Sequence, residues 1–175
     1  MNQTVRNAVR ATSVIAAAWV IGLATATSAN AHYVYEDEEV WANADSSRCL
    51  YNYAEVSHGS GAGYAKSQAH AGQNDFVGTC IFPWQRPAGT LAAGYRYQKW
   101  DGQKWYTCRQ LLSGDAVYNK TTTGSYTVSW DFGPHGLAPC GHGYYGTVGY
   151  SSTLYGGTWL AKDVGIWSGQ HFIEP

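Results

Sequence analysis

The first 31 residues constrain the fold most, because they predict the compartment in which the rest of the chain folds. Two arginines and no acidic residue precede an apolar stretch at residues 11–26. Residues 29–31 (Ala-Asn-Ala) have the small-x-small pattern after which signal peptidase cuts. The apolar stretch is too short, and too often broken by Gly and Thr, for a membrane span. We therefore expect residues 1–31 to be a signal peptide that is removed, and residues 32–175 to form one secreted domain without a stable membrane anchor.

All four cysteines lie beyond the expected cleavage site, in the part of the chain that would fold in an oxidising compartment. An even number of cysteines in an exported chain is typical of a disulfide framework. Four cysteines allow three pairings, and the sequence alone does not choose among them. We expect two disulfides, Cys49–Cys80 and Cys108–Cys140, because this pairing closes two loops of similar length.

Aromatic residues dominate the expected mature domain, which holds all fourteen Tyr and seven of the eight Trp. Tyr, Trp and Thr favour strands, whereas the many Gly residues mark turns. Long runs of helix-forming residues are missing, and roughly eight short stretches with strand character are separated by turn signals. This pattern predicts an all-β fold, an antiparallel β-sandwich or a barrel-like domain.

The charge balance excludes some classes of partner. The expected mature domain keeps nine of the eleven basic residues and all twelve acidic ones, so its formal net charge is −3. A nucleic-acid partner normally requires a basic face, and no Lys- or Arg-rich stretch indicates a membrane surface. The acidic run at residues 36–39 is interpreted as a solvated edge of the domain.

The clearest local pattern is a hairpin within residues 91–111, with Asp101-Gly102 as its expected two-residue turn. Such a turn would pair Trp100 with Gln103 and Gln98 with Trp105. Tyr95, Tyr97, Tyr106 and Cys108 would then face the core. The opposite side of the hairpin would carry two indoles, two guanidinium groups and two amides: Trp100, Trp105, Arg96, Arg109, Gln98 and Gln103.

This opposite side is a candidate ligand-binding face. The C–H face of a sugar ring can lie on a flat indole, while its hydroxyl groups need planar hydrogen-bond donors and acceptors. The alternative is that a second sheet covers these residues and that they only pack. A one-residue bulge after the turn would exchange the two faces and remove the argument.

His32 supports a different hypothesis, because cleavage after Ala31 would make it the first residue of the mature chain. Its free amine and imidazole would together suit Cu(II). Copper polysaccharide monooxygenases use such an N-terminal histidine with a second histidine of a β-sandwich, and this chain resembles them in that one residue and its position. The resemblance implies a copper-dependent, polysaccharide-active oxidase centred on His32.

Other catalytic patterns are missing from the sequence. It has no Gly-x-Ser-x-Gly elbow, no His-Glu-x-x-His and no phosphate-binding loop, and its cysteines are expected in disulfides. The sequence therefore favours an extracellular non-catalytic protein that binds a carbohydrate or a cell-wall polymer. A secreted protein-interaction factor, such as an inhibitor or a toxin-like protein, is a further alternative, with residues 133–143 as its presented loop.

Three short stretches near the C-terminus carry a second resemblance: residues 140–145 (CGHGYY), 156–159 (GGTW) and 168–171 (SGQH). Together with the Ala-rich start, they make the chain similar to small secreted proteins of actinobacteria that have no assigned activity. The resemblance implies an extracellular bacterial protein and carries no functional residue with it.

Overall fold

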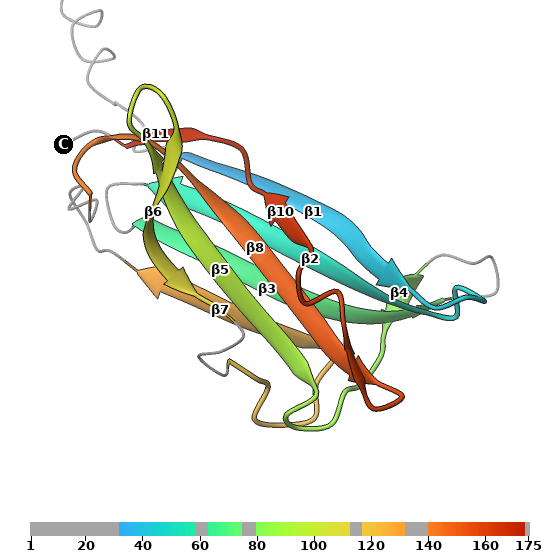
Figure 1. Cartoon of the computed structure of the whole chain (residues 1–175). Helices are drawn as coiled ribbons and strands as arrows, with labels where there is room; N and C mark the ends of the chain where they lie inside the picture. Colours follow the sequence, from blue (N-terminus) through green and yellow to red (C-terminus); the bar gives the residue numbers. More distant parts are fainter. Residues whose placement is uncertain (1–31, 59–62, 75–79, 113–116, 132–139, 174–175) are drawn as a thin grey trace, which may run out of the picture. The chain divides into compact units, whose positions relative to one another are not determined.

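The structure is a computed structural model that describes residues 32–58, 63–74, 80–112, 117–131 and 140–173 (Figure 1). These residues form eleven strands and no helix, which confirms the all-β prediction with more strands than the eight expected. The predicted signal peptide, residues 1–31, and most of the predicted loop, residues 133–139, lie outside the described residues. The strands are β1 (His32–Ala42), β2 (Arg48–His58), β3 (Gly63–Asn74), β4 (Cys80–Pro83), β5 (Leu91–Trp100), β6 (Trp105–Leu111), β7 (Ser125–Asp131), β8 (Gly143–Tyr155), β9 (Thr158–Leu160), β10 (Gly165–Trp167) and β11 (His171–Ile173).

Two antiparallel sheets make up the fold. The first sheet has the order β1-β2-β3, after which β3 pairs with β7 along one part of its length and with β4 along another. In the second sheet β6, β5 and β8 are neighbours, and β9, β10 and β11 each pair with a different part of β8. Figure 1 shows β5 and β8 lying across β2 and β3, as expected for a sandwich.

The core lies between the two sheets and consists mainly of small and aromatic side chains. Its buried members include Leu50, Ala54, Val56, Ala65, Ala69, Leu91, Ala93, Tyr95, Tyr97 and Tyr145. Tyr97 stacks on Tyr145, with ring centroids 4.9 Å apart. The small residues let the sheets approach closely, since a Cβ at Gly149 would lie 2.9 Å from that of Ala54.

A buried amide ties the two sheets together at this point of close approach. The Nδ2 of Asn52 on β2 donates to the carbonyl oxygen of Gly149 on β8 over 2.6 Å. The hydroxyl of Ser67 on β3 donates to Oδ1 of the same amide at 3.3 Å. Because the Asn52 side chain is fully buried, these partners offset the cost of removing it from water.

Both predicted disulfides are confirmed. Cys49 pairs with Cys80, which joins β2 to β4, and Cys108 pairs with Cys140, which joins β6 to the residues before β8. The Cα atoms of the two pairs are 6.2 and 6.1 Å apart, within the usual range for a disulfide. Two such bonds, with no free cysteine among the described residues, indicate an oxidising environment.

Candidate functional site

The turn between β5 and β6 is longer than the sequence predicted. Trp100 pairs with Trp105, so the loop comprises the four residues 101–104 instead of two. The carboxylate of Asp101 explains this, because it accepts hydrogen bonds from the backbone N–H groups of Lys104 and Gln103, each over 2.8 Å. The same hydrogen bonds lower the pKa of Asp101. The predicted pairing of Trp100 with Gln103 was therefore wrong, and the Gln103 side chain is exposed in the loop.

The predicted partner of Gln98 was also wrong, since Gln98 lies opposite Thr107. A bulge follows at this point, because the next pair in the ladder is Tyr97 with Arg109 and Cys108 has no partner in it. Arg109 is thereby turned toward the side of the sheet on which Tyr97 lies.

The bulge removes Arg109 from the predicted ligand-binding face. Its guanidinium carbon lies 4.4 Å from the ring centre of Trp130, which itself makes an edge contact with Tyr97. Trp130 belongs to the first sheet, so Arg109 lies at the margin between the two sheets. Placing Arg109 beside Trp100 and Trp105 was therefore wrong, for the reason that a bulge exchanges faces.

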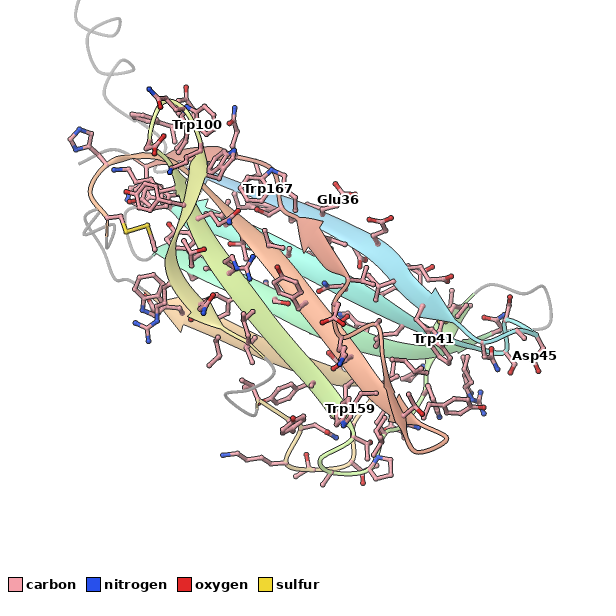
Figure 2. All side chains as sticks on the ribbon, viewed as in Figure 1. Glu36, Trp41, Asp45, Trp100, Trp159 and Trp167 are labelled. Atoms are coloured by element: carbon pink, nitrogen blue, oxygen red, sulfur yellow. A yellow bond between two sulfur atoms is a disulfide. The ribbon has the colours of Figure 1, made fainter. Side chains whose placement is uncertain are left out.

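Three half-buried indoles gather on the outer face of the second sheet, and we call them the tryptophan cluster: Trp100, Trp105 and Trp167. The ring centroids of Trp100 and Trp105 are 5.5 Å apart, and those of Trp105 and Trp167 are 4.7 Å apart. Figure 2 shows Trp100 and Trp167 at one end of the sandwich and Trp41 toward the other. The two predicted indoles do share a face, and a third, which the sequence analysis missed, joins them.

Trp167 reaches the hairpin because of a glycine. It lies on β10 opposite Val148 of β8, and Gly146 lies two residues back along β8 on the same face. A Cβ at Gly146 would lie 2.1 Å from Cη2 of Trp167, so any larger residue would occupy the place of the indole. Gly146 also pairs with Gln98, which puts the Gln98 amide in the same row of the sheet.

A cavity of about 270 Å³ lies further along the same outer face. Arg96 and Tyr150 line it from β5 and β8, and Lys162 and Asp163 line it from the turn after β9. The guanidinium of Arg96 lies 5.8 Å from the ring centre of Tyr150. Its Nε is buried and has no hydrogen-bond partner among the described residues. Arg96 also faces Val148, the residue that pairs with Trp167, so it links the cavity to the tryptophan cluster.

Two more aromatic side chains extend this face beyond the cluster. Tyr144 on β8 pairs with Phe172 on β11, and their rings meet edge to face with centroids 5.0 Å apart. Their side chains are 45 % and 44 % exposed, which is high for large apolar groups. Neither residue could be identified from the sequence, because the sequence does not show which segment pairs with β8.

The described residues contain no group of three or more His, Cys, Asp or Glu side chains that could hold a metal ion. The backbone of His32 begins β1 directly opposite His58 of β2, while the side chain of His32 lies outside the described part. The described part also contains no helix long and apolar enough to cross a membrane.

No family model, curated protein or solved structure is significantly similar to this chain. The resemblances to actinobacterial proteins and to copper monooxygenases therefore stay predictions.

Proposed function

We propose that the mature protein is an extracellular, non-catalytic binding protein for a carbohydrate or a cell-wall polymer, with the tryptophan cluster as its main contact surface. One observation carries this proposal. Three indoles from three separate strands, Trp100, Trp105 and Trp167, meet on one outer face and all remain partly exposed. Large aromatic groups gathered at a surface mark an interaction site more often than isolated ones do.

The polar neighbours of the cluster fit the same ligand. Sugar rings need an aromatic surface for their C–H face and planar donors for their hydroxyl groups. The Gln98 amide lies in the row of Gly146, between the hairpin and Trp167. Arg96, whose Nε is buried without a hydrogen-bond partner among the described residues, lines the cavity beside Tyr150 on the same face. A polymer lying on the indoles could thus place one unit in that cavity.

The test is a pull-down of the secreted, oxidised protein on insoluble chitin, cellulose, xylan and peptidoglycan. We expect saturable binding to at least one of them, abolished by Trp100→Ala combined with Trp105→Ala. Trp41→Ala is the matched control, since Trp41 is also half-buried but lies on β1 of the first sheet. Circular dichroism confirms that each variant is folded. Absence of binding to every polymer, or equal loss in the Trp41 variant, overturns the proposal.

A second candidate function, a copper-dependent oxidase, is favoured by the register at the start of β1. His32 lies opposite His58, and Nε2 of His58 is buried with no hydrogen-bond partner among the described residues. Cleavage after Ala31 would add the free amine of His32 to two imidazoles. Three such nitrogen ligands suit copper.

Copper binding is tested on the secreted protein after mass spectrometry has identified its first residue. We expect that residue to be His32, and a Cu(II) titration followed by electron paramagnetic resonance to show one bound ion. His58→Gln and a form with one extra residue before His32 should each weaken Cu(II) binding at least tenfold. A different first residue, or unchanged affinity in both variants, overturns this candidate.

A further inference from the structure

The outer face of the first sheet holds a second hollow, on the opposite side of the sandwich from the tryptophan cluster. It forms where β3 changes neighbours, since residues 64–70 of β3 pair with β7 and residues 72–74 pair with β4. Between these two parts, the backbone N–H of Ala71 donates to the carbonyl oxygen of Gly124, and the carbonyl oxygen of Ala71 accepts from the N–H of Trp84. The fork leaves a hollow of about 670 Å³.

Glycines and a disulfide shape the floor and one wall of this hollow. A Cβ at Gly72 would lie 2.5 Å from Sγ of Cys80 and 2.7 Å from Sγ of Cys49, so the disulfide covers the strand closely at this point. A Cβ at Gly124 would lie 2.9 Å from that of Pro83. Backbone and disulfide geometry therefore fix the floor and one wall of the hollow, and side chains form the rest of its lining.

Two polar side chains line the hollow without a hydrogen bond to any described residue. These side chains are Asp37 from β1 and His70 from β3. The strand between β1 and β3 is β2, whose Tyr51 pairs with His70. Burial raises the pKa of Asp37, and the nearby His70 partly offsets this. Burial likewise lowers the pKa of His70, again with a partial offset from Asp37. Both side chains are exposed and line the hollow, so their polar groups are accessible to a ligand there.

Apolar groups complete the lining. The side chain of Ile81 on β4 is 60 % exposed at the rim, and Tyr51 contributes a half-buried ring. Gln85 adds an amide on the same side as Ile81. An apolar wall with a few convergent polar groups is the usual composition of a small-ligand site. The carboxylate accepts hydrogen bonds from hydroxyl or amine groups, and the imidazole both donates and accepts.

The charges of β1 restrict which ligand fits. Glu39 lies two residues from Asp37 on the same face of β1 and pairs with Tyr51 in the ladder. Glu36 and Glu38 are exposed on the other face of the strand. Anionic ligands are therefore disfavoured here, because several carboxylates would repel them at short range.

We propose that this hollow is a second carbohydrate site, which takes an uncharged or amine-bearing sugar unit and rejects acidic sugars. Because the outer faces of the two sheets point away from each other, the protein can then hold two polymer chains at once. The site itself stands without the tryptophan cluster, and only the linking of two chains rests on the function proposed above.

The test is isothermal titration of the secreted protein with soluble hexamers of glucosamine, N-acetylglucosamine and galacturonic acid. We expect binding of at least one of the first two and none of the acidic hexamer. Asp37→Asn and His70→Gln should each weaken binding at least tenfold, which is the size expected for losing a hydrogen bond to a charged or buried group. Glu36→Gln is the matched control, because it removes the same charge from the other face of β1.

The two proposals fail in different ways. Hexamer binding that survives Trp100→Ala with Trp105→Ala but is lost in Asp37→Asn supports the hollow as a separate site. Hexamer binding lost only in the tryptophan variant overturns the hollow and leaves the cluster. No binding of any hexamer, or binding of the acidic one with equal affinity, also overturns the hollow, whatever the pull-down shows.

Discussion

A single methyl group added at Gly146 should disrupt the tryptophan cluster without changing any of its indoles. In Gly146→Ala the new Cβ would lie 2.1 Å from Cη2 and 2.3 Å from Cζ2 of Trp167, and 2.7 Å from the carbonyl oxygen of Gly169. Carbon atoms in favourable contact are about 3.5–4.0 Å apart. The indole of Trp167 must therefore move by more than an ångström, which breaks its edge contact with Trp105.

The expected cost follows from three contributions. Inserting a methyl group into a packed site costs about 1–3 kcal/mol, and the lost aromatic pair about 0.5–1.5 kcal/mol. Replacing Gly by Ala inside a strand returns about 0.5–1 kcal/mol, because Ala loses less conformational freedom on folding. We expect the free energy of unfolding of Gly146→Ala to fall by about 0.5–4 kcal/mol, and its affinity for the polymer to fall with the displaced indole.

A double-mutant cycle tests this reasoning. Urea unfolding followed by far-UV circular dichroism is measured for Gly146→Ala, Trp167→Ala and the double variant. Removing the indole removes most of the clash, so the double variant should be at least about 1 kcal/mol more stable than the two separate losses predict. Strictly additive losses would refute the claim that Gly146 is required by the indole above it.

Two further predictions concern buried polar groups. Burial alone would raise the pKa of Glu55, but hydrogen bonds from Lys66, Tyr53 and Tyr64 outweigh it and hold the pKa below its ordinary value of 4.5. The stabilisation from these hydrogen bonds is present above the unfolded-state pKa and is lost as the pH falls through the folded-state pKa. In urea unfolding, Glu55→Gln should therefore lose less stability between pH 7 and pH 3 than the unchanged protein does. An equal loss would contradict this prediction. The Nδ2 of Asn119 donates to three backbone carbonyl oxygens. In Asn119→Asp a carboxyl group would face these oxygens, so its pKa would be raised and the fold would become less stable as the pH rises. We expect this substitution to lower the free energy of unfolding by about 3 kcal/mol at pH 7 and by less at pH 3. A cost independent of pH would show that the carboxylate does not face those oxygens.

The all-β class could be predicted because it depends on short-range patterns. Alternating Tyr, Trp and Thr with Gly at turns is a property of local sequence. The sequence alone did not choose among the three cysteine pairings; the one expected for its two loops of similar length is confirmed by the structure. The number of strands was less accessible, because β9, β10 and β11 have only three residues each. Strands that short are defined by their pairing with β8 rather than by their own pattern.

The hairpin shows which errors matter for a face assignment. The Asp101 carboxylate lengthened the turn by two residues, an even number, so Trp100 and Trp105 kept the shared face that the shorter turn predicted. The bulge at Cys108 added one residue, an odd number, and so moved Arg109 to the opposite face. An even change in turn length leaves the face assignment correct, so the first error did no harm. The second error could not be avoided from the sequence, because the bulge depends on how β6 pairs with β5.

The distribution of aromatic side chains supports a binding role more strongly than their number does. All seven described tryptophans are partly exposed, as is common for this large side chain, which is rarely fully buried. Between the sheets lie buried tyrosines, such as Tyr97 and Tyr145, together with small residues, and Gly149 and Ala54 come into near contact there. Trp41, Trp84 and Trp130 pack against this core. Trp100, Trp105 and Trp167 instead lie together on the outer face of the second sheet, where they can contact a ligand as a group.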